Sequence, residues 1–393
     1  MSFFSHPVWM RTRDRVSSPV KASLAIASVF VVMLFFSLSN LPSHDATLSP
    51  LSSMQIRHKP DNINIKGVMF YGRRQFVDIL DCYLQRNLAI NGGYLDEMMF
   101  VVHTDVTQDL GYLQDLVARV PQYKYIELEL HDENAGYGPL YETLRENNTI
   151  YIKIDDDLVW IDDDAVPRIV HTLIEHPEAH AIGGNIINSA HASWIHYHND
   201  AIYPYLPEPE PQSQQQEVTD WRASKLPKYP HNVHGHYDFS GADDKWDQGD
   251  RLIPVGSLGG PPSVNHRWLP LTPTSQNLQM TPIRGVEYHE FGRGWRNWAI
   301  GAQQLYSHLE NLEKDQLEKY WFGSGEGVWN MHYQRLNVNF LAIWGSSIAM
   351  QLPGGDDEYD LTVRIPEKFG RRESKTHFLL MHATPLTLHS CTD

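Results

Sequence analysis

The sequence predicts an α/β fold with a mostly parallel central sheet flanked by helices, and three observations support this class. Short apolar strands alternate with amphipathic helices from about residue 66 onward. The strand at 97–104 is mostly apolar, as a strand buried on both faces of a parallel sheet is. Hydrophobic residues make up 41% of the 393 residues, which is enough for a sizeable core. Strands joined by helices indicate βαβ units.

The individual elements are predicted from the periodicity of apolar residues and from the residues that begin and end helices. The expected strands are GVMFY (67–71), EMMFVVHT (97–104), YKYIELEL (123–130), TIYIKI (149–154), AHAIGGNIINS (179–189) and NVNFLAIWGSSI (337–348). The expected helices are QFVDILDCYLQRNLAI (75–90), LGYLQDLVARV (110–120), LYETLRE (140–146), AVPRIVHTLIEHP (165–177) and one or two within 297–322. Residues 203–235 carry many prolines, glutamines and histidines, which predicts a long functional loop or a disordered insert.

The amino-terminal part predicts a membrane anchor. Residues 22–39 contain no charge, and as a helix they would be about 27 Å long, close to the hydrocarbon thickness of a bilayer. Four basic residues precede them against one aspartate, so the positive-inside rule places residues 1–21 in the cytosol. Residues 40–64 read as a stem and residues 65–390 as the main domain. A cleaved signal peptide is the alternative.

Charge and cysteine content narrow the function. The formal net charge of −16 argues against nucleic-acid binding, which needs a basic surface. An acidic protein that binds phosphates needs a local positive charge to hold them, and a bound divalent cation would supply it. Cys82 and Cys391 are the two cysteines, and two cysteines do not make a disulfide framework, so both are expected to be free, with a single long-range bridge between them as the alternative. Asn147 begins a glycosylation sequon, NNT, just before a strand.

Two aspartate runs stand within ten positions of each other and predict different roles. Asp155, Asp156 and Asp157 directly follow the strand at 149–154, at the sheet edge where α/β proteins bind ligands. Carboxylate oxygens there suit Mg²⁺ or Mn²⁺.

The second run precedes the helix at 165–177. Aspartate is a favoured N-cap and negative charge suits a first helical turn, so Asp162, Asp163 or Asp164 is expected to cap this helix.

The chain resembles the GT-A glycosyltransferases of the secretory pathway. An anchor, a stem and βα repeats with a strand ending in KIDDDLVWI carry the resemblance, which covers roughly residues 66–385. MFYGRRQFVDILDCYLQRNL, YIKIDDDLVWI and NSAHASWIHYH are similar to a group of fungal glycosyltransferases of undefined specificity. The resemblance implies a GT-A-like, Rossmann-like domain in a single-pass membrane protein of the Golgi or endoplasmic reticulum, with the domain in the lumen.

The resemblance also implies the site. Asp155 and Asp157 match the Asp-x-Asp positions that hold Mn²⁺ or Mg²⁺ against the diphosphate of a nucleotide-sugar, and His382 is the expected late metal ligand. Arg73 and Arg74 follow the first strand and would contact the donor, together with the whole run from Asp155 to Asp157. The acceptor would be a glycan, a glycoprotein or a glycolipid.

An inverting enzyme needs a general base for the acceptor hydroxyl. GGDDEYDLTV (354–363) offers Asp357 or Glu358, and a retaining enzyme would need neither. Trp194 and Tyr197 are candidates for stacking on an acceptor sugar, or they belong to the core.

A non-catalytic luminal binding or partner protein with a degenerate fold of the same kind is the alternative function. A calcium protein is disfavoured, since the acidic loop lacks EF-hand spacing.

Overall fold

The computed structural model describes residues 58–128, 137–208, 220–230, 267–272, 278–289, 292–321, 328–335 and 337–382, which belong to one compact unit, His58–Asp393. The predicted anchor at 22–39, most of the predicted stem, Cys391 and parts of the 203–235 loop lie outside these residues. In the described part of the chain, no helix is long and apolar enough to cross a bilayer.

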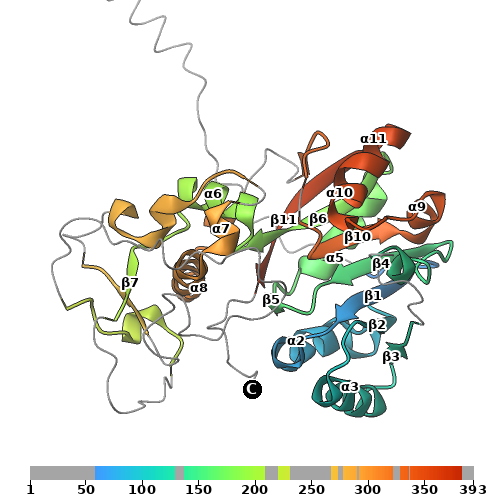
Figure 1. Ribbon diagram of the computed structural model, residues 1–393, viewed down its shortest axis with the longest axis horizontal. Coiled ribbons are helices and arrows are strands. Elements are labelled where there is room, and N and C mark those ends of the chain that lie inside the picture. Colours follow the sequence, from blue (N-terminus) through green and yellow to red (C-terminus); the bar gives the residue numbers. More distant parts are fainter. Residues whose placement is uncertain are drawn as a thin grey trace, which may run out of the picture. The chain divides into compact units, whose positions relative to one another are not determined.

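A mixed sheet organises the described residues, and the predicted α/β class with a mostly parallel sheet is confirmed (Figure 1). Its order is β3-β2-β1-β4-β10-β6-β11-β5, with β9 paired to β11. Strands β1, β2, β3, β4, β6 and β11 run in one direction, whereas β5, β9 and β10 run in the other. The strands are β1 (Asn64–Tyr71), β2 (Glu97–Val102), β3 (Tyr123–Ile126), β4 (Thr149–Ile154), β5 (Leu158–Ile161), β6 (Ala179–Ile187), β9 (Trp329–Asn330), β10 (Phe340–Trp344) and β11 (Arg372–His382).

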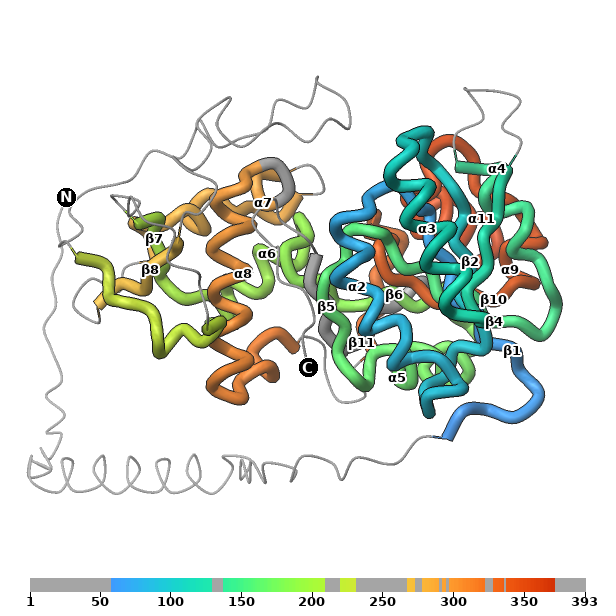
Figure 2. The backbone as a smooth tube through the Cα atoms, turned by 90° about the horizontal axis from the view of Figure 1, so that it is seen from below, coloured from blue at the N-terminus to red at the C-terminus, as the bar shows by residue number. Residues whose placement is uncertain are grey.

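Helices cover both faces of this sheet (Figures 1 and 2). The helices are α2 (Arg74–Asn87), α3 (Thr107–Arg119), α4 (Gly138–Tyr141), α5 (Ala165–Glu175), α9 (Gly345–Met350), α10 (Asp357–Tyr359) and α11 (Ile365–Phe369), with a π-helical turn at Asp360–Arg364. Alternate strand residues face opposite ways, so Ile150 and Ile152 of β4 pack with α2, α3 and α5, whereas Tyr151 packs with α4 and α9. Both faces are therefore buried, as the apolar strand sequences predict.

The boundaries of three predicted elements were wrong. The strand at 123–130 ends already at Ile126, and the helix at 140–146 is a short turn of helix at Gly138–Tyr141, because the chain must reverse into β4 within a few residues. The strand at 337–348 ends at Trp344, where α9 begins. A Cβ atom at Gly345 would lie 2.3 Å from the Glu146 carbonyl oxygen, so this junction requires glycine.

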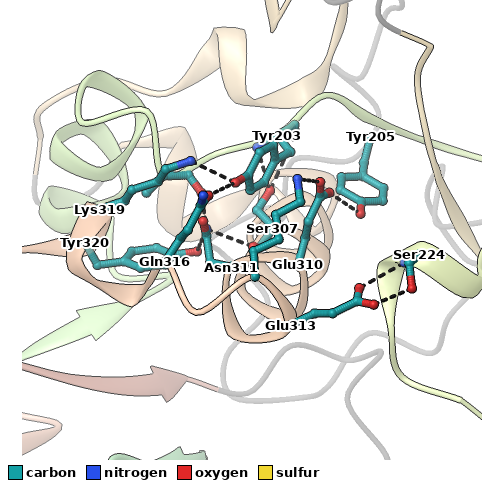
Figure 3. Close-up of polar contacts among 12 residues, drawn as sticks. Tyr203, Tyr205, Ser224, Ser307, Glu310, Asn311, Glu313, Gln316, Lys319 and Tyr320 are labelled. Carbon is teal, nitrogen blue, oxygen red and sulfur yellow. Dashed lines mark hydrogen bonds and ion pairs between the residues drawn. The ribbon is translucent and has the colours of Figure 1, made fainter.

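A second region follows β6 and consists of α6 (Ala190–His198), α7 (Arg293–Arg296), α8 (Trp298–Glu313) and the two-stranded β7 (Tyr205–Pro207) and β8 (Trp268–Pro270). The predicted helix within 297–322 is confirmed as α8. Polar side chains of α8 bind the chain segment that leads into β7 (Figure 3). The backbone N–H of Tyr203 donates to Ser307 Oγ at 3.0 Å, and Asn311 donates to the Ala201 carbonyl at 2.7 Å.

Two further sequence features can be placed. Cys82 of α2 is disulfide-bonded, so the prediction of a free thiol there was wrong. Asn147 is exposed in the turn before β4.

Candidate functional site

The first aspartate run forms the turn that leaves the carboxyl end of β4. The backbone N–H of Asp155 donates to the Asn339 carbonyl at 2.8 Å, and that of Leu158 donates to the Asp155 carbonyl at 3.3 Å. β1 runs parallel to β4, so Gly72 and Arg73, which follow β1, lie at the same edge. The run therefore sits where the predicted topology places a ligand.

Arg73 neutralises the second and third aspartates of the run. Asp156 accepts from the Gly72 backbone N–H at 2.7 Å and from Arg73 Nε at 2.8 Å. A second guanidinium nitrogen of Arg73 lies 2.9 Å from Asp157 Oδ2. Burial by itself lowers the pKa of Arg73, but the charges of Asp157 and Asp156 outweigh it and raise the pKa above its usual value. Arg73 therefore bridges two carboxylates.

Lys153 neutralises the first aspartate. Its side chain is 5% exposed, pairs with Asp155 and donates to the Val338 carbonyl at 3.2 Å. Asn339 donates its amide to the other Asp155 oxygen at 2.9 Å. Burial raises the pKa of the Asp155 carboxyl, against the charge of Lys153. Two cations thus face three carboxylates, which explains how the run is tolerated in the folded chain.

Asp357 joins this group from the far end of the chain. It is buried in α10, and the Tyr141 hydroxyl donates to its Oδ2 at 2.7 Å. Its charge acts on both Lys153 and Asp155, so the three groups share one electrostatic environment. Burial, and next the charge of Asp357, raise the pKa of Tyr141. The phenol therefore stays a hydrogen-bond donor that orients this carboxylate.

Glu358 has a different partner. Arg335 donates its Nε to Glu358 at 2.7 Å and holds Asp356 with its two terminal nitrogens at 2.7 and 3.0 Å. Burial raises the pKa of Glu358, and Arg335 opposes this effect. Of the two predicted bases, Asp357 is the one that shares an electrostatic environment with the aspartate run.

The remaining predicted site residues lie around this centre. Arg74 stands over the Tyr112 ring of α3, with its guanidinium carbon 5.1 Å from the ring centroid. His382 ends β11, and its backbone lies opposite that of Leu158, the residue directly after Asp157. Its side chain lies outside the described structure.

The metal hypothesis can be tested on donor chemistry. Asp155 and Asp157 supply hard carboxylate oxygens, the ligand type that Mg²⁺ and Mn²⁺ prefer, at a sheet edge that also carries the His382 backbone. Among the side chains that the structure describes, no three of His, Cys, Asp or Glu are arranged as a ready metal cluster. The residue types fit a divalent cation, and a ligand from outside the two aspartates has to complete its shell.

The second run lies directly before α5. Asp164 occupies the N-cap position of α5, but its side chain makes no capping bond and instead pairs with Arg168 at 3.1 Å. Asp162 accepts from the Asp164 backbone N–H at 3.2 Å. Asp163, with a side chain 68% exposed, pairs with Arg86. The expectation that the side chain of Asp162, Asp163 or Asp164 caps this helix was therefore wrong.

Sequence reasoning missed Lys153, Tyr141, Asn339 and Arg335. Lys153 had a visible signal, because a lysine inside the buried strand TIYIKI needs a nearby counter-charge. The other three lie far from their partners in the sequence, and nothing local marks them.

No family model matches the chain, and no curated protein matches it. Solved structures give partial matches. Glucosyl-3-phosphoglycerate synthase from Mycobacterium tuberculosis, in complex with Mn²⁺, UDP and phosphoglyceric acid, is 15% identical with a TM-score of 0.25, and the match covers 32% of this chain and 43% of that one. 4-Diphosphocytidyl-2C-methyl-D-erythritol synthase from Anaerococcus prevotii is 13% identical with a TM-score of 0.24, and the match covers 32% of this chain and 55% of that one. S. aureus TarS is 13% identical with a TM-score of 0.24, and the match covers 31% of this chain and 35% of that one. None of these three matches covers more than 55% of the solved chain.

Proposed function

We propose that this protein is a metal-dependent glycosyltransferase that moves a sugar from a nucleotide-diphosphate sugar to a glycan, protein or lipid acceptor. The observation that carries the proposal is the meeting of the run at Asp155–Asp157 with Asp357 at the carboxyl edge of the sheet. Carboxylates separated by about two hundred residues are brought to one place, each with its own positioned partner.

In this proposal Asp155, Asp157 and His382 hold Mn²⁺ or Mg²⁺. The bound cation supplies charge neutralisation for the departing diphosphate. Asp156 keeps Arg73 at the end of β1, where the guanidinium is available to donor phosphates once a cation takes over Asp157. Arg74, on the first turn of α2, is the second donor contact.

Asp357 is proposed as the general base of an inverting reaction, with Glu358 as the alternative. The Tyr141 hydroxyl fixes one oxygen of Asp357 at 2.7 Å, which leaves the other to accept the proton of an acceptor hydroxyl. Glu358 is the weaker candidate, because Arg335 already occupies its carboxylate in an ion pair.

We further propose a luminal domain behind an anchor at residues 22–39, in the Golgi or endoplasmic reticulum. The basic residues upstream of that stretch motivate the orientation, and the disulfide at Cys82 suits an oxidising compartment. Protease treatment of sealed microsomes tests this, since digestion of the large domain without detergent would refute the orientation.

The activity is tested with a panel of nucleoside diphosphates, with and without Mn²⁺. A true donor product at about one hundred times its dissociation constant stabilises the fold by about 2.7 kcal/mol. Asp157→Ala should lower transfer at least roughly 10³-fold, because a cation ligand is lost. Folding should survive, since Arg73 keeps its contacts with Asp156. Full activity in this variant would refute the assigned role.

One observation favours the alternative of a non-catalytic luminal partner protein. Every carboxylate of the run already has an in-chain cation, Lys153 or Arg73, so the fold does not need a metal there. Absence of stabilisation by every nucleotide in the panel would favour this alternative.

A further inference from the structure

An exposed aromatic cluster lies on α6 and the segment before α7. Trp194 and Tyr288 keep 37% and 41% of their surface exposed. Their ring centroids lie 5.8 Å apart at an interplanar angle of 73°, and the His198 ring lies 4.0 Å from that of Trp194. The rings are held by one another, so large apolar surfaces are presented to solvent in a fixed arrangement.

This cluster is connected to the acidic site through one short segment. Tyr288 donates its hydroxyl to Gln334 at 3.0 Å. The next residue, Arg335, holds Glu358, and Asn339 holds Asp155. Five residues span at most about 18 Å, so Gln334 stands within that distance of Asn339. The segment 334–339 therefore contacts the aromatic cluster at one end and the aspartate run at the other.

The same segment contains an unusual turn. His332 and Tyr333 are both exposed and both adopt left-handed backbone conformations, with φ angles of 51° and 60°. Residues other than glycine rarely adopt this conformation, and two in succession are strained. Such strain concentrates at ligand-binding positions, and here it presents a further aromatic ring next to Gln334.

We propose that Trp194, Tyr288 and the turn at His332 and Tyr333 form the platform on which the terminal pyranose of an acceptor glycan stacks. This inference rests on the proposed function. The C–H bonds on one face of a pyranose carry partial positive charge, which suits the negative face of an aromatic ring. Gln334, which accepts the Tyr288 hydroxyl, supplies a neighbouring amide group for sugar hydroxyls. The rings of Trp194 and Tyr288 carry no charge, so a neutral sugar fits them.

The test uses the full-length chain in detergent on an array of defined oligosaccharides ending in mannose, galactose, glucose or N-acetylglucosamine. We expect binding to one terminal sugar, weakened at least about tenfold by Trp194→Ala and by Tyr288→Ala. Trp194→Phe should retain most of the binding. Trp221→Ala is the matched control, because Trp221 is 39% exposed in another segment, and it should bind normally.

Thermal stabilisation by a nucleoside diphosphate with Mn²⁺ is measured on the same samples. A wild type that is stabilised but binds no array glycan overturns the platform and leaves the donor site standing. An equal loss of glycan binding in Trp221→Ala also overturns the platform. So does a result in which the Trp194 and Tyr288 variants keep their glycan binding and change their oligomeric state. Glycan binding without any nucleotide effect supports the platform and counts against the proposed transfer.

Discussion

Strand β4 and helix α8 are both largely buried, yet different interactions hold them. β4 packs apolar side chains on both faces of the sheet, and Lys153 is its only charged residue. The buried side of α8 instead carries Gln303, Gln304, Ser307, His308 and Asn311. Nonspecific apolar burial tolerates variation in detail, whereas a polar network depends on each partner being present. The following variants test that contrast, beginning with the largest expected effect.

Removing the counter-charge of the one lysine in β4 should be the most damaging change. Asp155→Ala removes the one carboxylate paired directly with Lys153 and leaves only the charges of Asp357 and Asp157 to act on it, and breaking a buried pair costs roughly 3–5 kcal/mol. Urea denaturation measures the loss. Lys153→Met combined with Asp155→Asn should recover much of it, and a double variant as unstable as Asp155→Ala would show that the charge pair is not the cause.

The two kinds of packing can be compared directly. Ile152→Ala should destabilise the fold by roughly 2–5 kcal/mol through a cavity in the sheet core. Asn311→Ala should cost roughly 1–3 kcal/mol, because the Ala201 carbonyl loses its buried donor. Asn91→Ala, which removes an exposed amide bound to the Gln85 carbonyl, is the control with little expected effect. An Asn311 variant as stable as this control would contradict the role given to the α8 network.

A buried histidine in α8 should make the stability of the fold sensitive to acid. His308 is buried against Trp160 and Tyr320, and burial lowers its pKa to about 3. The unfolded chain takes up a proton near pH 6.5 while the folded chain does not, so stability falls with pH from about 6.5 downward. The slope is at most roughly 1.4 kcal/mol per pH unit.

Melting temperatures between pH 7 and pH 5 measure this, and His308→Phe should flatten the dependence. His180→Phe should act in the same direction, because burial and the charge of Arg371 lower the pKa of His180 to about 4. An unchanged pH dependence in both variants would place the acid sensitivity elsewhere.

The smallest effect is expected at Asp163. Its exposed ion pair with Arg86 is worth at most about 1 kcal/mol, so Asp163→Ala should leave both melting temperature and turnover nearly unchanged. This variant is the matched control for Asp157→Ala. A collapse of turnover in Asp163→Ala would mean that the roles of the two aspartate runs are reversed.

The contrast between apolar and polar packing also explains which parts of the fold could be predicted from the sequence. β1, α2, β2, α3 and β4 could be predicted because burial on known faces imposes a period on apolar residues. β5 was missed, since LVWI is a four-residue strand enclosed by two aspartate runs. α6 was missed because AHASWIHYH has no apolar stripe.

The site divides in the same way. Asp155 and Asp157 could be found because a local motif follows a buried strand. The link from Asp357 to Tyr141 spans 216 positions and the link from Asn339 to Asp155 spans 184, so only the folded chain reveals them. Long-range hydrogen bonds leave no local pattern in a sequence.

The insertion of β10 between β4 and β6 has a consequence for biosynthesis. A ribosome delivers β4 and β6 long before Phe340–Trp344 emerges, so these two strands wait with open edges and cannot pair across the gap. Until then Lys153 lacks the Val338 carbonyl, and Asp155 lacks Asn339. These strand edges therefore stay unpaired while residues 188–339, roughly two fifths of the chain, are synthesised, and exposed apolar edges favour aggregation during that interval.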